Sequence, residues 1–227
     1  MQNEPEEFYR EHAANSMSNA MHECISRFYE NLIGRSEAFI HFIYPKLREI
    51  TGDTFADVTE RELYEAANVA QPGLIRCDAD ELTYCLHIMV RYELEKRMFD
   101  GTLTAHDLPA EWNRLYKEYL GVDVPDDRQG VLQDSHWSNG NIGYFPSYAI
   151  GSAYGAQYLL ELSKELDVDS VVRSGDLTPI NKWLEEKIWK YGCMKDPVAL
   201  FESVCGKFDP DCYVAYLEKK FTEVYGL

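Results

Sequence analysis

Apolar residues recur every three or four positions through most of this chain of 227 residues. That spacing predicts amphipathic helices, because it places the apolar side chains on one face of a helix with 3.6 residues per turn. The first three predicted helices cover about residues 15–34, 39–52 and 59–68. Thr59 and Glu62 have the spacing of a capping box, which predicts that they start the third helix.

Two further helices are predicted in the middle of the chain, over about residues 79–99 and from Pro109 to Gly121. Proline at the start and glycine just after the end are typical of helix boundaries. Asp78 or Asp80 is placed to cap the longer of the two helices. The apolar stripe that we expect to face the core on that helix consists of Leu82, Cys85, Leu86, Met89 and Met98.

The last third of the chain continues the helical pattern. A helix is predicted over about residues 146–166, in which Gly151 and Gly155 would let another backbone approach closely. Three Thr-Pro or Asp-Pro pairs then each start a helix, at 178–179, 196–197 and 209–210. Residues 142–145 suggest at most a short extended strip. We therefore predict an all-α fold, formed as a single helical domain over residues 1–227.

The charge balance restricts the partners that the chain can bind. It carries 39 acidic against 22 basic residues, a formal net charge of −17, so phosphate backbones and anionic membrane surfaces would repel it. No apolar run is long enough to cross a bilayer, and the acidic N-terminus is unlike a signal peptide. Six cysteines without a Cys-x-x-Cys pair are typical of reduced thiols. We expect a cytoplasmic protein that binds neither nucleic acid nor membranes.

Residues 130–157 differ from the rest of the chain, because polar side chains are interspersed there with five glycines. The polar and aromatic members are Gln133, Asp134, His136, Trp137, Asn139, Asn141, Tyr144 and Tyr148. Side chains that donate or accept hydrogen bonds or that titrate, in a segment with low helix propensity, are typical of the lining of a functional site. A loop whose Asp and Gln side chains cap neighbouring helices has a similar composition. The residues alone favour neither interpretation.

Three motifs decide between the two interpretations. The first is Gly-x-x-Gln-Asp-x-His-Trp over 130–137, the second is His-Glu at 22–23, and the third is Ile-Arg-x-x-Ala-Asp over 75–80. Together they resemble motifs of the Taq-type metallocarboxypeptidases, the thermostable carboxypeptidase family. The resemblance runs from about Glu7 to the C-terminus and covers only the C-terminal part of such an enzyme. The family's His-Glu-x-x-His helix, with two zinc-binding histidines and the catalytic glutamate, would lie before residue 1.

The resemblance makes Glu23 the third ligand of a catalytic zinc, with cobalt as an alternative metal. Consecutive helical residues point about 100° apart, so His22 and Glu23 do not readily bind one metal together. His22 would instead orient the Glu23 carboxylate by a hydrogen bond. Without the resemblance, a surface ion pair between Glu23 and Arg27 would be the simpler interpretation.

Arg76 lies at the entry to a predicted helix, where the helix dipole is already positive, so an anionic partner is expected nearby. That partner is either Asp78 or Asp80, or a substrate carboxylate that the guanidinium binds bidentately through two N–H groups. The resemblance favours the substrate, and it makes His136 the catalytic hydrogen-bond donor to the tetrahedral oxyanion. The predicted substrate-binding residues are Arg76, Gln133, Asp134 and Tyr144, of which Gln133 and Asp134 would also shape the position of His136.

By resemblance, a complete family member removes C-terminal residues from peptides with a free C-terminus and is usually a homodimer. One carboxylate is fewer than the three protein ligands of a catalytic zinc, and no His-x-x-x-His pair occurs. We therefore predict the C-terminal portion of a zinc carboxypeptidase, inactive alone. It would be a fragment, one half of a split enzyme, or a non-catalytic remnant that binds peptides or another subunit. Apolar Met17, Met21 and Ile25 favour an enzyme part, unless this chain itself buries them.

Overall fold

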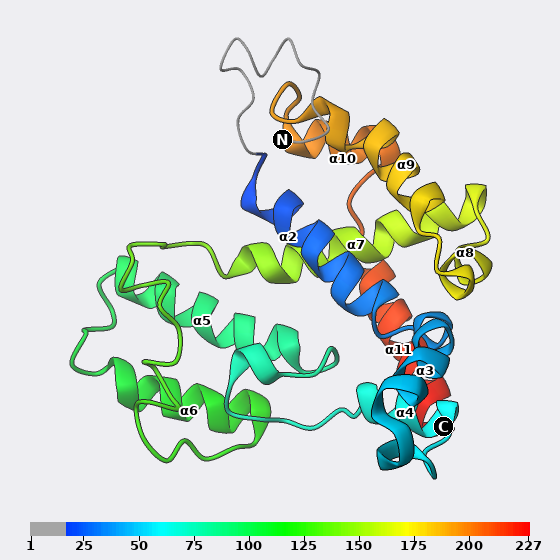
Figure 1. The fold of residues 1–227 in the computed structure, drawn as a ribbon. Helices are drawn as coiled ribbons and strands as arrows, with labels where there is room; N and C mark the ends of the chain where they lie inside the picture. The colour runs from blue at the N-terminus through cyan, green and yellow to red at the C-terminus, as the bar shows by residue number, and fades with distance from the viewer. Residues whose placement is uncertain (1–16) are drawn as a thin grey trace. The chain divides into compact units, whose positions relative to one another are not determined.

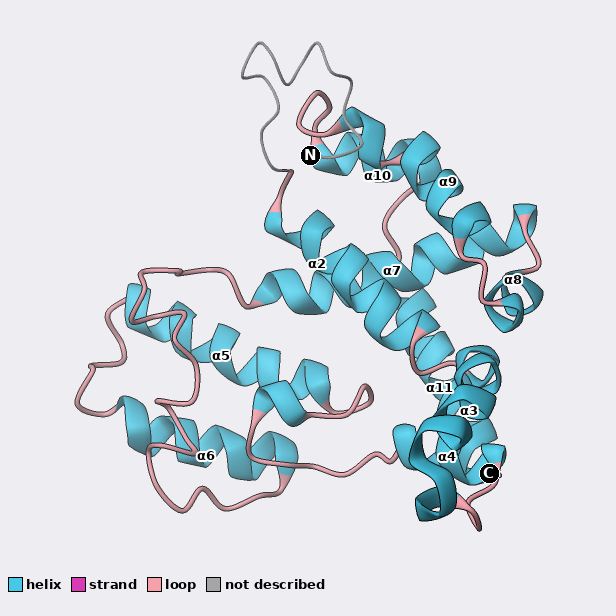
Figure 2. Cartoon of the chain, in the orientation of Figure 1, coloured by secondary structure: helices cyan, strands magenta, loops and turns pink. Residues whose placement is uncertain are grey.

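The computed structural model describes residues 17–227, and every regular element in that range is a helix (Figures 1 and 2). The α-helices are α2 (Asn19–Arg27), α3 (Glu37–Thr51), α4 (Glu60–Ala67), α5 (Tyr84–Phe99), α6 (Leu108–Leu120), α7 (Pro146–Glu165), α8 (Val168–Ser174), α9 (Thr178–Lys187), α10 (Pro197–Cys205) and α11 (Asp211–Tyr225). A π-helical segment (Phe28–Ile33) continues α2, and 3₁₀ turns occur at Gly52–Phe55, Arg76–Asp78 and Trp189–Tyr191. The predicted all-α class is confirmed.

Two details of the predicted elements differ from the structure. Residues 142–145 form turns, and no strand occurs within residues 17–227. Helix α8 (Val168–Ser174) was not predicted, because its seven residues are too few to show a clear period. The predicted start of the first helix at Asn15, and Glu7, lie outside the described residues. None of the described helices is both long and apolar enough to cross a membrane.

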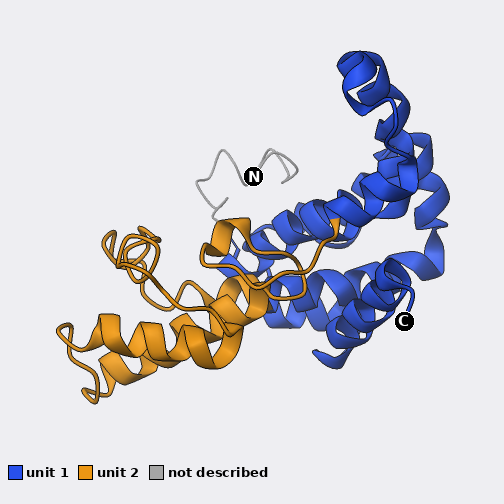
Figure 3. Ribbon diagram, turned by 90° about the horizontal axis from the view of Figure 1, so that it is seen from below, with its two compact units in different colours: residues 1–67, 150–227 blue, residues 68–149 orange. Residues whose placement is uncertain are grey.

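The chain divides into two compact units (Figure 3). Unit 1 contains residues 17–67 and 150–227 of the described chain, and unit 2 contains residues 68–149. The single domain over residues 1–227 stays a prediction. Each unit is compact and has its own core.

The core of unit 1 gathers side chains from α2, the π-helical segment and α7 to α10. Cys24, Phe28, Tyr158 and Leu184 are fully buried there, and Tyr154 stacks on Phe201 with ring centroids 4.0 Å apart. Other side chains of this core from the N-terminal helix are Met21, which is 3% exposed, and the partly buried Met17 and Ile25. Their apolar character therefore follows from burial within unit 1 and does not distinguish an enzyme part from a binding module.

The predicted caps are confirmed at Thr59 and Asp196 but not at Thr178 or Asp209, since Pro210 is the cap residue of α11. The Thr59 amide donates to Glu62 Oε2 at 2.8 Å and the Glu62 amide donates to Thr59 Oγ1 at 3.2 Å, which is the reciprocal pair of a capping box. Asp196 accepts from the amide of Ala199 and caps α10. Thr178 is not a cap, because it is already the first residue of α9. The two confirmed caps rely on neighbours in sequence, which is why the sequence predicts them.

In unit 2, helices α5 and α6 pack against each other around Val90, Leu94, Trp112, Leu115 and Tyr116. The stripe predicted to face the core of α5 was wrong for Leu82 and Met89, which are 42% and 47% exposed. Leu86 and Met98 do pack against the core, although they are only partly buried, as is Cys85. Apolar residues surround much of this helix, so their period does not select one face. The face that is buried also carries the polar residues His87, Arg91 and Glu95. This polar face is what positions the candidate site.

Candidate active site

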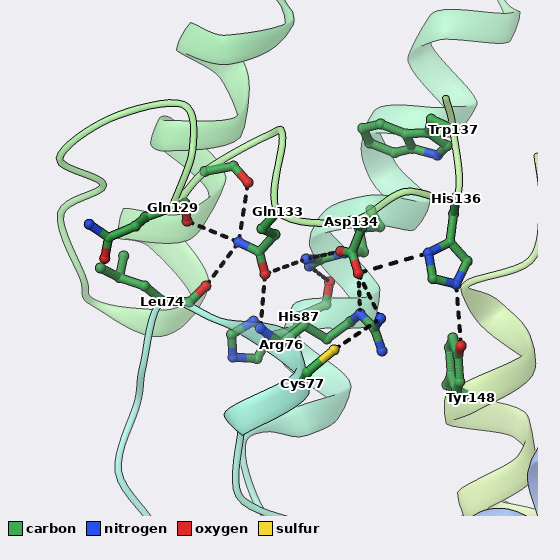
Figure 4. A network of polar contacts seen from close by, with 12 residues as sticks. Leu74, Arg76, Cys77, His87, Gln129, Gln133, Asp134, His136, Trp137 and Tyr148 are labelled. Carbon is green, nitrogen blue, oxygen red and sulfur yellow. Dashed lines mark hydrogen bonds and ion pairs between the residues drawn. The ribbon is translucent and has the colours of Figure 1, made fainter. Parts of the chain in front are cut away.

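Asp134 is the centre of a buried ion-pair network in unit 2 (Figure 4). Its Oδ1 atom accepts from Arg76 Nε at 3.0 Å and from Arg76 Nη2 at 2.6 Å. Its Oδ2 atom accepts from Arg91 Nε at 2.8 Å and from Arg91 Nη2 at 2.5 Å. Both guanidiniums therefore bind the same carboxylate through two nitrogens each, an arrangement that fixes orientation as well as charge.

Gln133 connects this network to the neighbouring backbone. Its Oε1 accepts from the Arg76 amide and from Arg91 Nη2, both at 2.9 Å. Its Nε2 donates to the carbonyls of Leu74, Gln129 and Gly130 at 3.0 to 3.2 Å. These bonds use both ends of the amide, so the 129–134 segment is held against the chain that enters the 3₁₀ turn at Arg76.

Charge compensation keeps Asp134 ionised. Burial alone would raise the pKa of the Asp134 carboxyl, but the hydrogen bonds from Arg76 and the charges of Arg91 and Arg76 hold that pKa below its usual value. Burial would lower the pKa of Arg76, but the hydrogen bond to Asp134 and the nearby charges together outweigh it and raise that pKa. The guanidiniums of Arg76 and Arg91 share the single carboxylate of Asp134, and all three side chains are almost completely buried.

His136 lies at the edge of this network. Its Nδ1 is 3.8 Å from Asp134 Oδ1, and its Nε2 is 3.2 Å from the hydroxyl of Tyr148. The imidazole packs against the rings of Phe145 and Tyr144, with centroids 4.5 and 5.3 Å away. The side chain is 17% exposed, so most of the imidazole is packed and a small part of it reaches solvent. A supported, partly exposed imidazole can donate, accept or transfer a proton.

The structure brings together Arg76, Gln133, Asp134, His136 and Tyr144, all of which lie in unit 2. Asp80, one of the acidic partners considered for Arg76, does not bind it, and the substrate carboxylate stays a prediction. Asp80 accepts instead from the amides of Gln71 and Thr83 and from the Thr83 hydroxyl. The anion beside Arg76 is Asp134, 58 positions along the chain, which local sequence patterns do not reveal.

Three residues of the site were not predicted: Arg91, Glu95 and Tyr148. Arg91 is fully buried and Glu95 is 5% exposed. Together with His87 they recur every four residues along α5, which places them on one helix face. Three polar residues at that spacing are a signal that the sequence did contain. Tyr148 was counted among the polar residues of the stretch 130–157 but received no role.

His22 and Glu23 lie on α2, which belongs to unit 1. Glu23 is partly buried and accepts at Oε2 from the hydroxyl of Ser26 at 2.8 Å, whereas His22 is exposed. Arg27 donates to Glu30 at 2.6 Å and to Ser152 at 3.3 Å, so it has partners besides the one considered for it in Glu23. Glu23 as a metal ligand and His22 as its support stay predictions.

The predicted close approach at Gly151 and Gly155 is confirmed on α7. A Cβ added at Gly151 would lie 2.7 Å from the Cys24 amide nitrogen and 2.8 Å from the Glu23 carbonyl carbon. We expect Gly151→Ala to cost about 1–3 kcal/mol in the free energy of unfolding, because backbone atoms of α2 cannot yield easily. Gly155→Ala is the matched control, since its Cβ would meet the flexible Leu32 side chain at 3.3 Å. Equal urea midpoints for the two variants would contradict the expectation.

The described residues do not form a complete metal site. Within residues 17–227, no group of three or more His, Cys, Asp or Glu side chains is arranged to hold an ion. A catalytic zinc needs three protein ligands, so Glu23 can contribute one at most. No catalytic step through a metal can therefore be derived from this chain alone.

His87 makes the free energy of unfolding depend on pH. Burial, followed by the charges of Arg91 and Arg76, lowers the pKa of His87 to about 4. The unfolded chain holds this histidine near its ordinary pKa of about 6.5, so unfolding takes up a proton between these two values. The stability that neutral His87 contributes is fully present above about pH 6.5 and is lost as the pH falls toward 4, by up to roughly 1.4 kcal/mol per pH unit.

The measurement for this expectation is urea unfolding of the wild type and His87→Gln between pH 7.5 and pH 4.5. The glutamine variant should lose part of the pH slope. His106→Gln is the control, because the His106 side chain is 95% exposed and should leave the slope unchanged. The same slope in wild type and His87→Gln would contradict the expectation.

Comparisons with known proteins agree with this arrangement. A sequence model of the carboxypeptidase Taq (M32) metallopeptidases matches residues 1–221. Carboxypeptidase 1 of Bacillus subtilis is 39% identical over 210 residues, which are 92% of this chain and 42% of that protein. Thermostable carboxypeptidase 1 of Thermus thermophilus is 39% identical over 225 residues, 98% of this chain and 44% of that protein. The crystal structure of the M32 carboxypeptidase from Deinococcus radiodurans R1 superposes with a TM-score of 0.89 at 37% identity, covering 94% and 44% of the two chains.

The chain thus spans less than half the length of the curated relatives that it matches. The family model and the Deinococcus radiodurans structure each cover most of this chain. This agreement covers the helices that carry Glu23 as well as the segment with Gln133, Asp134 and His136. The chain belongs to the carboxypeptidase Taq (M32) metallopeptidase family.

Proposed function

We propose that this chain is the C-terminal portion of a zinc-dependent carboxypeptidase, which removes C-terminal amino acids from peptides. The observation that carries the proposal is His136, a partly exposed imidazole supported by a buried ion-pair network in a chain that matches a metallocarboxypeptidase family over residues 1–221. The family implies a divalent metal, and we infer zinc, with cobalt as a substitute. Glu23 would be the only ligand from this chain, and a His-Glu-x-x-His segment would supply the others.

In this proposal His136 contacts the substrate directly. Its imidazole would donate a hydrogen bond to the carbonyl oxygen of the scissile peptide bond, and the bond would strengthen as negative charge develops there. The Tyr148 hydroxyl, 3.2 Å from Nε2, would orient the imidazole, and Tyr144, whose ring packs against it, would contact the substrate. The network behind His136 needs no rearrangement during the reaction, which is the condition for electrostatic stabilisation of a transition state.

Arg76 has a different role in this proposal from the carboxylate clamp that its position suggested. Its Nε and Nη2 atoms face Asp134, Nη1 donates to the Tyr84 hydroxyl at 2.9 Å, and Nη2 also approaches Cys77 Sγ at 3.6 Å. A substrate carboxylate would have to displace one of these partners. Arg76 therefore fits best as the residue that fixes Asp134, and through it His136. Gln133 contributes by holding the Arg76 amide.

The isolated chain tests the first part of the proposal. We expect it to contain much less than one zinc per chain and to release no amino acid from peptides, because its described residues do not form a three-ligand site. The measurement is elemental analysis of the purified chain, together with a quantitative amino-acid release assay. Stoichiometric zinc with turnover would refute this expectation. Activity that appears only after addition of a chain carrying the His-Glu-x-x-His segment would support a split or truncated enzyme.

The native size of the protein separates the proposed origins. We expect an immunoblot of source cells to show a species much heavier than 26.3 kDa, since the curated relatives are more than twice as long as the matched region. A native species of 26.3 kDa with a co-purifying partner would favour a split enzyme, and the same species without a partner would favour a peptide-binding remnant. We also propose a cytoplasmic homodimer for the complete enzyme, which sedimentation analysis and cell fractionation would test.

A further inference from the structure

A single carboxylate of α5 contacts both ends of the turn that separates His136 from Tyr144. Glu95 Oε1 accepts from the indole nitrogen of Trp137 at 2.6 Å and from the backbone nitrogen of Gly143 at 3.2 Å. The residues between these two donors, 138–142, are exposed to solvent. The Glu95 bonds thus hold the two ends of an otherwise exposed turn.

Within the turn, the bonds are local. The amide of Asn141 donates to the carbonyl of His136 at 2.8 Å, and the amide of Gly140 donates to the carbonyl of Trp137 at 3.0 Å. Such bonds keep the turn folded on itself but do not attach it to a helix. Gly143 has a φ of 72°, a conformation that glycine adopts readily, and it directs its N–H toward Glu95. The turn is therefore attached to α5 at one end by the indole of Trp137 and at the other end by the backbone N–H of Gly143.

Glu95 is poorly placed for any role in solvent. It is 5% exposed, and the hydrogen bonds that it accepts come from two neutral N–H groups. Burying a carboxylate is costly unless hydrogen bonds replace its water, and bonds to an ionised acceptor are stronger than bonds between neutral groups. Trp137 is fixed further by edge contacts with Trp112 and Phe145, at centroid distances of 6.1 and 5.8 Å. A rigid helix thus holds the residue next to His136.

We propose that Glu95 is a positioning residue, which sets the orientation of His136 and Tyr144 by attaching the 137–143 turn to α5 through Trp137 and Gly143. Its relevance to catalysis rests on the proposed function of His136. The attachment itself is a property of unit 2 and can be measured without any peptidase activity. Failure of the proposed function therefore remains distinguishable from failure of this inference.

The test uses Glu95→Ala, Glu95→Gln and Glu93→Ala in the 227-residue chain, followed by NMR. In Glu95→Ala we expect hydrogen exchange at the Gly143 amide to accelerate by about tenfold or more, since a bond to a charged acceptor is lost. The signals of the His136 ring and the Trp137 indole N–H should move with it. Glu95→Gln should retain the wild-type pattern, because an amide oxygen can accept the same two bonds. Glu93→Ala is the matched control, since the Glu93 side chain is 37% exposed on the same helix.

Trp137→Phe provides a second variant in case Glu95→Ala does not fold. Phenylalanine keeps an aromatic ring against Trp112 and Phe145 but has no N–H to donate. We expect faster exchange at Gly143 and a shifted His136 signal in this variant also. Wild-type exchange and an unchanged His136 signal in the variants that fold would overturn the proposal. A Glu95→Gln variant that behaves like Glu95→Ala would also overturn the proposal. It would mean that the negative charge of Glu95, and not its two hydrogen bonds, determines the position of the turn.

Discussion

Asp134→Asn is expected to lower the free energy of unfolding by about 3–5 kcal/mol, which is the usual cost of removing one partner from a buried ion pair. The substitution would leave the guanidiniums of Arg76 and Arg91 buried without a negative partner. An asparagine has nearly the same shape as the aspartate, but its amide nitrogen would face N–H donors on whichever side it points. The loss therefore comes from charge and hydrogen bonding and not from a cavity.

Urea unfolding at pH 7 measures this effect, and Asp127→Asn is the matched control. Asp127 lies in the same segment and is exposed, so its substitution should change stability by less than about 0.5 kcal/mol. The low pKa of Asp134 adds a second signature. A depressed pKa contributes stability that is present above the unfolded value of about 3.9 and is lost as the pH falls through the folded pKa. The difference between wild type and Asp134→Asn should therefore shrink in acid. A constant difference from pH 7 down to pH 3 would contradict this account.

The helix boundaries were largely predictable, because they depend on residues close together in sequence. The capping box of Thr59 and Glu62, the Asp196 cap and the glycine stop after α6 at Gly121 all follow local rules. Gly151 and Gly155 also announced a close helix contact through their spacing. What these features share is that the residues that signal them lie within one turn of each other or on one helix face.

The candidate site was predictable only as a collection of residues. Gln133, Asp134 and His136 stood out by composition and by family resemblance, and the structure places them together. The pairing of Arg76 with Asp134 was not predictable, because it joins two loops that only the folding of unit 2 brings together. Burial of Arg91 was equally hidden, since an arginine in a helix is usually solvated. Arg91 lies four residues from both His87 and Glu95, so polar residues at helical spacing can mark a buried helix face, as apolar residues do.

His136→Ala is expected to lower kcat by about 10²–10³-fold in an active preparation, meaning this chain combined with the segment that carries His-Glu-x-x-His. The reason is that a hydrogen-bond donor held by Asp134 and Tyr148 acts mainly where negative charge develops, so its removal affects the transition state more than the bound peptide. We therefore expect a small change in KM. Steady-state release of a C-terminal amino acid measures both constants.

His106→Ala is the control for this experiment, because His106 is also in unit 2 but its side chain is 95% exposed. It should retain wild-type kcat and KM. Tyr148→Phe adds a graded comparison, since it removes the hydroxyl 3.2 Å from His136 Nε2 and keeps the aromatic ring. If that hydroxyl only orients the imidazole, the loss in kcat should be smaller than for His136→Ala. A full-sized loss would mean that Tyr148 contacts the substrate itself, and wild-type kcat in His136→Ala would remove His136 from the reaction.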